Sequence, residues 1–202
     1  LQDRSSFEQI FDQLVDLDTT IQDVLELLES ARQEGYVYQG DLEDLAYQAV
    51  DRWDTIRPQV EQRVTKKARH FQAQLRALSP IIQRLNATLG NPAAANAPLG
   101  EARDKANQLD WDLNQAESEV RDQFHSVEST MSELKRRLTR IHWGLDQLAE
   151  AKFELEKGEM LYQAVPARWD QEGKDDPEGI LYLTDQRLIF EQKEKVATKK
   201  VL

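Results

Sequence analysis

The sequence predicts a mainly α-helical protein, a long antiparallel three-helix bundle or coiled coil followed by a small antiparallel β-unit. In the first thirty-odd residues, apolar side chains recur at alternating steps of three and four, as in a helical seam. Two longer segments with similar spacing follow, which indicates two more long helices. After Gly158 this period gives way to short runs of β-forming residues.

Composition limits the classes of function. The formal net charge of −11 argues against non-specific binding of nucleic acid, because phosphates attract basic surfaces. The chain has no cysteine, so no disulfide scaffold, thiolate metal site or cysteine nucleophile is expected. No apolar run reaches the roughly 20 residues that span a bilayer, and no signal peptide is visible. A cytoplasmic location is therefore expected, and the ends at Leu1 and Leu202 suggest a fragment of a longer protein.

The first helix is predicted to run from Ser5 or Ser6 to Gln33. Ser5 can cap the first free N–H groups, with Glu8 three residues later as in a capping box. Two glycines, at 35 and 40, then indicate that the chain reverses. The seam of this helix consists of Phe7, Ile10, Leu14, Leu17, Ile21, Val24, Leu28 and Ala31.

The second helix is predicted from about Asp41 to Leu89, with a mean apolar step nearer 3.6 than 3.5 and so little supercoiling. Pro58 should kink it, and Ser79-Pro80 should act as a cap and first position where the helix stops and restarts. Its predicted apolar positions are Leu42, Leu45, Ala49, Trp53, Ile56, Val60, Val64, Ala68, Phe71, Leu75, Leu78, Ile82 and Leu85.

The third helix is predicted from about Glu101 to Lys157, after a linker turn over residues 90–100. Since short turns make neighbouring helices antiparallel, residues 5–35, 40–70 and 119–149 should form the bundle. Residues 71–118 should then extend beyond it as a two-helix arm. The predicted domains are thus the helical part, 1–157, and the β-unit, 158–202.

The β-unit is predicted to contain a strand at 160–165 and a hairpin that turns at 184–187, with a further strand from Lys195 to Leu202. Four hairpin side chains should need cover, either from the end of the third helix, through Phe153 and Leu155, or from a second chain. The four are Leu181, Leu183, Leu188 and Phe190.

The hairpin carries a family resemblance. The segment Gly179-Ile-Leu-Tyr-Leu-Thr-Asp-Gln-Arg-Leu-Ile-Phe190, preceded by Glu159, resembles the opening hairpin of GRAM and bacterial PH-like domains. That resemblance covers about 45 residues at the C-terminal end. It implies a β-sandwich capped by a helix, used to bind a lipid headgroup or a protein and not for catalysis. Such a domain needs roughly twice this length, so the resemblance implies an incomplete PH-like unit.

No residue pattern in the chain indicates catalysis, a cofactor or a metal. Asp122 and His125 have the one-turn spacing of carboxylate-bridged metal sites, but no Glu-x-x-His partner exists on the other helices. The segment 110–114 begins like a calcium loop, yet it lacks the required glycine and glutamate and lies in a helical seam. We therefore expect a protein that is not an enzyme.

Two surfaces are candidates for interaction. Basic residues of the second helix, Arg63, Lys66, Lys67 and His70, either complement the acidic first helix or contact an anionic surface. The arm should leave Ile81, Leu89 and Trp111 open to water, and such patches usually mark association sites. An arm-mediated homodimer is thus predicted, with a fold-back at Pro80 as the alternative. Its candidate contact residues are Leu78, Ile81, Ile82, Leu89 and Trp111.

Together these features predict a non-enzymatic cytoplasmic scaffold or oligomerisation module that acts through protein partners, with homo-oligomers expected. The alternative is a peripheral, membrane-binding dimer similar in layout to BAR–PH proteins, in which the PH-like unit serves as a lipid or protein adaptor. This alternative rests on layout alone, so membrane binding is the less favoured of the two.

Overall fold

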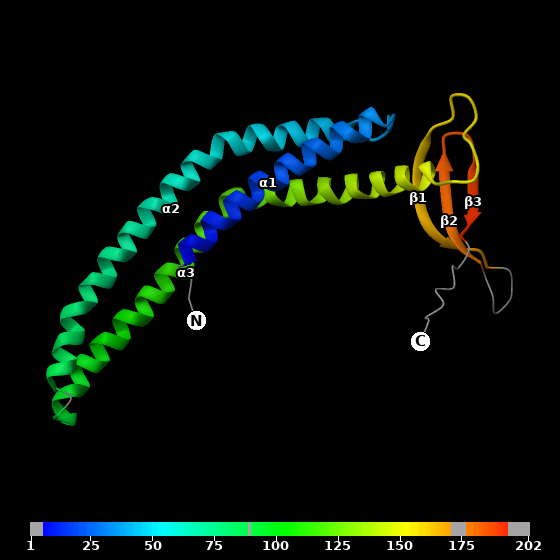
Figure 1. Ribbon diagram of the computed structural model, residues 1–202. Helices are drawn as coiled ribbons and strands as arrows, with labels where there is room; N and C mark the ends of the chain where they lie inside the picture. The colour runs from blue at the N-terminus through cyan, green and yellow to red at the C-terminus, as the bar shows by residue number, and fades with distance from the viewer. Residues whose placement is uncertain (1–5, 89, 171–176, 194–202) are drawn as a thin grey trace, which may run out of the picture. The chain divides into compact units, whose positions relative to one another are not determined.

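The computed structural model describes residues 6–88, 90–170 and 177–193 (Figure 1). Three long helices come first: α1 (Ser6–Gln33), α2 (Asp41–Thr88) and α3 (Pro92–Ala149). A three-stranded antiparallel sheet follows, in the order β1 (Leu161–Arg168), β2 (Glu178–Thr184) and β3 (Leu188–Gln192). The predicted fold class, a helical bundle followed by a small antiparallel β-unit, is confirmed.

The chain divides into two compact units, each containing parts of all three helices. The first unit comprises residues 1–19 and 48–130, and the second comprises residues 20–47 and 131–202, which include the sheet. Among the described residues, no helix combines the length and the hydrophobicity that a membrane span needs. The predicted domain boundary at residue 157 stays a prediction.

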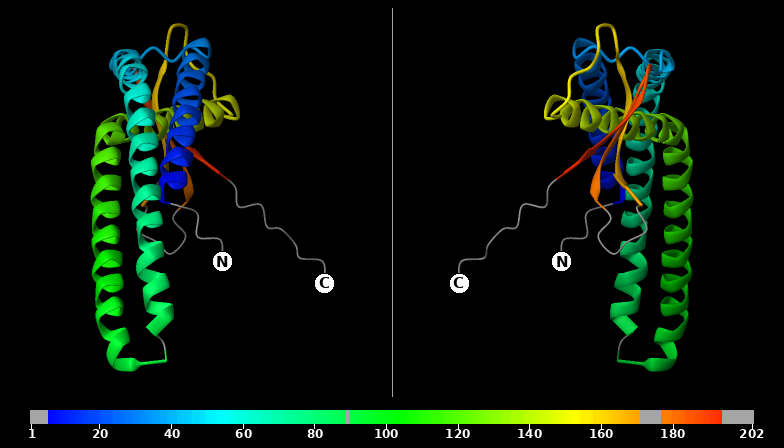
Figure 2. Two further views of the ribbon diagram at one scale, coloured as in Figure 1. Left: turned by 90° about the vertical axis from the view of Figure 1, so that its left-hand side faces the viewer. Right: turned by 90° about the vertical axis from the view of Figure 1, so that its right-hand side faces the viewer.

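In the first unit, α2 and α3 lie side by side and antiparallel up to the turn that joins them (Figures 1 and 2). Trp53 of α2, which is only 3% exposed, contacts the other two helices. Its Nε1–H donates to Asp18 Oδ1 of α1 at 2.8 Å, and its ring packs edge-to-face on Phe124 of α3. The predicted seam of α1 is buried from Ile10 to Ala31, while the side chain of Phe7 lies outside the described set.

The buried side of α2 differs from the prediction at three places. Leu45, Leu75 and Ile82 were predicted to face inward, but they are exposed. Their neighbours Ala46, Gln74 and Ile81 take those positions, with the two apolar ones buried and Gln74 half-buried. The observed and the predicted inward positions both keep steps of three and four, so contact with the neighbouring helices, and not the spacing, decides which of two adjacent residues is buried.

Two predicted interruptions of the helices, the stop and restart at Ser79-Pro80 and the linker turn at residues 90–100, are wrong, whereas the kink predicted at Pro58 stays a prediction. Helix α2 continues through Pro58 and Pro80, and both rings lie on its exposed side, where water can reach the carbonyl that loses its donor. The predicted linker is helical from Pro92 onward. Asn91 caps it, since its Oδ1 accepts from the N–H of Ala94 at 3.3 Å, and proline is favoured at the first helical position.

The second unit joins the end of α3 to the sheet. Helix α3 ends at Ala149 rather than at Lys157, and the chain after it turns across one face of the sheet. There Phe153 packs edge-to-face on Tyr182 at 5.0 Å, so it covers the face of the hairpin opposite to the one that it was predicted to cover. Leu155 is half-buried without belonging to that cluster. The predicted turn at 184–187 is present, whereas the predicted strand from Lys195 lies outside the described residues.

The face of the hairpin that packs on the helices is the opposite of the predicted one. Ile180 and Tyr182 are buried, together with Leu161 and Ala164 of β1. The predicted inward set is open instead: Leu183 and Leu188 are exposed, and Leu181 and Phe190 are half-buried. Because β2 carries apolar residues on both faces, its sequence lacks the alternation that marks the inner side of a strand.

Candidate functional site

The described residues contain no group of three or more His, Cys, Asp or Glu side chains that could hold a metal ion. His125 lies near Glu128, with Nδ1 3.5 Å from Oε2, and it is largely exposed. The features considered for function are therefore one cavity, two buried polar clusters and two surfaces.

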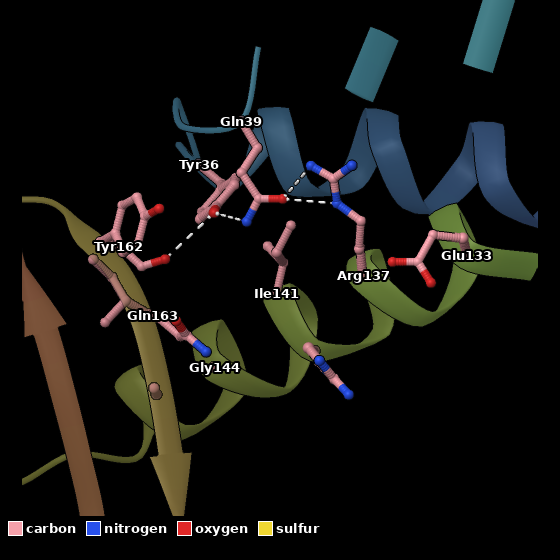
Figure 3. Close-up of a pocket in the computed structure, with 11 residues that line it drawn as sticks. Tyr36, Gln39, Glu133, Arg137, Ile141, Gly144, Tyr162 and Gln163 are labelled. Carbon is pink, nitrogen blue, oxygen red and sulfur yellow. Dashed lines mark hydrogen bonds between the residues drawn. The ribbon is translucent and has the colours of Figure 1, made fainter. Parts of the chain in front are cut away.

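A cavity of about 280 Å³ in the second unit lies among the α1–α2 turn, α3 and β1 (Figure 3). Arg137 of α3 donates to Gln39 Oε1, from Nε at 3.0 Å and from Nη2 at 2.7 Å. Gln39 Nε2 donates to the hydroxyl of Tyr36 at 3.0 Å, and that hydroxyl donates to the carbonyl of Tyr162 at 3.3 Å. This chain of hydrogen bonds connects α3, the turn and β1.

The polar groups of this cavity are thus largely occupied with one another. The Arg137 guanidinium also binds the carboxylate of Asp41, whose pKa it lowers. Gly144 adds a second contact, since a Cβ there would lie 3.4 Å from the backbone nitrogen of Ala164 and would touch β1. These features explain the cavity as a joint that holds the first strand on the helices.

A buried carboxylate fixes the hairpin. The side chain of Glu159 has no exposed surface and forms a bidentate ion pair with Arg187, in which both N···O distances are 2.8 Å. Thr184 Oγ1 donates to Glu159 at 2.7 Å, and the N–H of Glu156 donates to it at 2.7 Å. Arg187, with help from the two other donors, lowers the pKa of Glu159 from 4.5 to about 2.

Glu159, Thr184 and Arg187 are three of the residues on which the family resemblance rests. The structure brings them into one cluster although up to 28 positions separate them. Their observed role is to hold the turn of the hairpin against the segment before β1.

A second polar cluster closes the inner face of the sheet. The hydroxyl of Tyr182 lies 3.0 Å from the carbonyl of Gln147 and 3.1 Å from Glu191 Oε2. Burial, followed by the contact with Glu191, raises the pKa of Tyr182. Glu191 Oε1 also accepts from the N–H of Lys152 at 2.8 Å. The sheet is therefore fixed to the end of α3 through both apolar packing and buried hydrogen bonds.

The four predicted basic residues of α2 come together on one surface. Arg63, Lys66, Lys67 and His70 line a hollow of about 420 Å³ with Glu119, Val120 and Gln123 of α3, and we call this the basic hollow. Lys67 Nζ lies 3.0 Å from Glu119 Oε2 and lowers the pKa of that carboxyl. Its partner is thus on α3, whereas the sequence predicted partners on the acidic first helix.

The predicted contact residues of the arm have mixed positions. Trp111 is 62% exposed and Ile82 is 49% exposed, so both are open to a partner. Ile81 was predicted to be open, but it is buried at 6%, because it occupies the heptad position between Leu78 and Leu85. Leu78 is half-buried, and the side chain of Leu89 lies outside the described set.

Two exposed leucines, which the sequence reasoning missed, complete an apolar stripe on the arm. Leu75 and Ile82 of α2 each follow an inward position by one residue, and so does Leu99 of α3. In an antiparallel helix pair, positions with this relation lie along the same flank. We call Leu75, Ile82 and Leu99, which are 59%, 49% and 54% exposed, the open flank. Trp111 stands two residues after the inward Leu109 and two before Leu113, and it therefore lies on the outer side of α3, outside the open flank.

The same flank of α2 is covered nearer the start of the helix. Asp18 of α1 contacts Trp53 and Arg57 of α2. Because the two helices are antiparallel, Ser6, twelve residues before Asp18, is level with positions twelve residues after these two, that is, with residues 65 to 69. One heptad before Leu75 lies Ala68, which is half-buried. The open flank is therefore the continuation of a covered helical surface beyond the start of α1. The predicted inward positions 71, 75, 78, 82 and 85 keep heptad steps as well as the observed ones do, so the sequence alone does not reveal this flank.

No protein-family model, no curated protein and no solved structure matches this chain. The resemblance to GRAM and bacterial PH-like domains accordingly stays a prediction. Function has to be argued from the two surfaces and the cavity.

Proposed function

We propose that the protein is a non-enzymatic scaffold that associates with itself through the arm. The observation that carries this proposal is the open flank, a row of three large aliphatic side chains that are each about half exposed. Large aliphatic side chains exposed together along one flank are typical of an interface. The row also continues a surface that α1 covers elsewhere on α2, which supports a helical partner.

Self-association is energetically reasonable. Complete burial of one leucine or isoleucine side chain contributes roughly 1.5–3 kcal/mol. A two-fold interface uses the same surface on both copies and so buries each group twice. This doubling helps to offset the several kcal/mol that association costs in lost translation and rotation.

Replacing Leu75 and Ile82 together by glutamate should convert the protein to a monomer, because four carboxylates per pair of copies would have to be buried. Sedimentation equilibrium of the full chain at tens of micromolar tests this. Val15 and Val37 are exposed to a similar degree and lie outside the arm, so Val15→Glu with Val37→Glu should leave the association unchanged. A monomeric unaltered chain, or a dimer insensitive to Leu75→Glu with Ile82→Glu, would contradict the proposal.

The β-unit fits this scaffold as an adaptor, which is the use that its family resemblance implies. The Glu159–Arg187 pair and the Tyr182 cluster fix the β-unit to the segment before β1 and to the end of α3. Its ligand, a lipid headgroup or a protein, is part of the same proposal.

The basic hollow favours a second candidate function, contact with an anionic membrane. Between Glu61 and the end of α2 there is no acidic residue, so local charge is positive although the whole chain is acidic. Juxtaposed Lys and Arg residues each contribute about 1 kcal/mol near an anionic bilayer.

Co-sedimentation with vesicles that contain phosphatidylserine should then show binding that weakens from low to moderate salt, since screening reduces such attraction. Arg63→Ala with Lys66→Ala should weaken it severalfold, whereas Arg103→Ala on α3 serves as the control. Absent or salt-independent binding would exclude this second function.

A further inference from the structure

We infer that the open flank packs on the open flank of a second copy, with α2 of each copy lying along α3 of the other. This inference rests on the proposed self-association and names its partner and its geometry.

The two helices of the arm carry opposite charge. From Gln62 to Thr88, α2 has six basic residues and no acidic one: Arg63, Lys66, Lys67, Arg69, Arg76 and Arg84. From Pro92 to Asp122, α3 has seven acidic residues against three basic ones. The acidic residues are Glu101, Asp104, Asp110, Asp112, Glu117, Glu119 and Asp122.

Two antiparallel helix pairs can stack face to face about a two-fold axis in two ways. An axis across the helices places α2 on α2 and α3 on α3, so that like charges meet. An axis along the helices places α2 of each copy on α3 of the other, so that opposite charges meet. Like charges in close contact disfavour a complex, and the charge distribution therefore selects the second arrangement.

Ion pairs within the chain show which positions of α2 and α3 are level. Lys67 pairs with Glu119 at 3.0 Å, and Arg84 pairs with Glu101 at 2.8 Å. In an antiparallel pair, residues at the same level have numbers with a constant sum, and in these two ion pairs the sum is 186 and 185. An axis along the helices keeps the same levels between copies. Arg76 is then level with Asp110 of the second copy, and Arg69 with Glu117 of the second copy, since both pairs add to 186.

These four charged side chains make few or no hydrogen bonds and ion pairs within the described part of their own chain. Arg69 and Arg76 form neither a hydrogen bond nor an ion pair with any residue that the structure describes. Glu117 has an oxygen, Oε1, that is buried without a hydrogen-bond partner among the described atoms. Glu117 also forms no hydrogen bond or ion pair with any residue that the structure describes, so its carboxylate can turn outward to a guanidinium of a second copy. Asp110 Oδ2 accepts only a long bond, 3.4 Å, from Asn114 of its own helix.

The heptad positions place the four residues beside the stripe. Asp110 and Glu117 each follow an inward position of α3, Leu109 and Ala116, by one residue on the side of the open flank. Arg69 and Arg76 each follow a flank residue of α2, Ala68 and Leu75, and lie just outside it. Asp110 and Glu117 thus share the flank of α3 with Leu99, and Arg69 and Arg76 of the second copy border it, so these charged groups determine orientation rather than most of the affinity.

Charge reversal tests the geometry in the full chain. One variant carries Arg69→Glu with Arg76→Glu, and the other carries Asp110→Lys with Glu117→Lys. Each alone should self-associate on the order of tenfold more weakly, because four attractive pairs per dimer become repulsive. Mixed in equal amounts, the two should form a heterodimer with opposite charges restored at every pair. Native mass spectrometry resolves the three species, and circular dichroism verifies that each variant keeps its helices.

The outcomes separate the two proposals. A dimer that Leu75→Glu with Ile82→Glu disrupts, but that shows no preferred heterodimer in the mixture, would overturn the geometry and leave the scaffold function intact. A monomeric unaltered chain would overturn both. If α2 packed on α2 of the second copy, Arg69→Glu with Arg76→Glu would replace one like-charge contact by another, so this variant alone would self-associate as strongly as the unaltered chain. It would also pair with the unaltered chain more tightly than that chain pairs with itself, and either result would overturn the geometry.

Discussion

Replacement of Trp53 by alanine is expected to lower the free energy of unfolding by about 3–5 kcal/mol, the range for removing a large buried aromatic side chain. Trp53 is 3% exposed, and it contacts both Asp18 of α1 and Phe124 of α3. The substitution would leave a cavity where three helices meet and would remove the donor for Asp18 Oδ1. Chemical denaturation of the full chain measures the loss.

Two further variants separate packing from hydrogen bonding. Trp53→Phe keeps an aromatic ring but lacks the N–H, so it should lose less than the alanine variant. Trp111→Ala removes an equal side chain that is 62% exposed, and it should cost less than about 1 kcal/mol. Equal losses at Trp53 and Trp111 would show that the packing around Trp53 is wrong.

The helices could be predicted because their seams repeat over many turns. The seam of α1 from Ile10 to Ala31 is buried as its spacing predicts. On α2 the same reasoning failed where two apolar residues are neighbours, as at Ile81 and Ile82. Hydrophobicity alone does not choose between adjacent isoleucines. Spacing does not choose either, because both isoleucines stand at steps of three and four from Leu78 and Leu85. The partner helix decides, and it buries Ile81.

The exposed residues of the arm could likewise be predicted only in part from hydrophobicity. Of its predicted contact residues, Trp111 and Ile82 are exposed, whereas Leu75 and Leu99 were missed. Leu75 was assigned to the seam because Gln74, its neighbour, is polar. The half-buried Gln74 nevertheless occupies the inward position, so binary patterning misplaced the stripe by one residue there.

In the β-unit, the strands and the turn followed from local sequence, but the inward face did not. Leu181 and Tyr182 are both apolar enough to be buried. The buried one is Tyr182, whose hydroxyl reaches Gln147 and Glu191 and whose ring meets Phe153. These partners lie far along the chain and are brought together only by the fold. The end of α3 at Ala149 has the same cause, because Phe153 covers the sheet instead of continuing the helix.

Acid should loosen the hairpin through Glu159. Its pKa falls from 4.5 to about 2 in the folded protein, so an unfolded hairpin takes up a proton at a higher pH than a folded one. The stability that the carboxylate contributes is therefore complete above about pH 4.5 and is lost as the pH falls toward 2. Amide hydrogen exchange of β2 and β3, corrected for intrinsic rates, should show protection decreasing over that interval.

Glu159→Gln should isolate this effect from that of the other carboxylates. Glutamine has one acceptor oxygen in place of two, so it can keep only one of the bonds from Thr184 and from the N–H of Glu156, and it leaves the guanidinium of Arg187 without its counter-charge. The variant should lose protection in β2 and β3 already at neutral pH, and its remaining protection should change much less between pH 4.5 and 2. Glu154→Gln, at an exposed position five residues earlier, is the matched control and should behave as the unaltered chain. If Glu159→Gln kept full protection at neutral pH, the buried pair would not be what holds the hairpin.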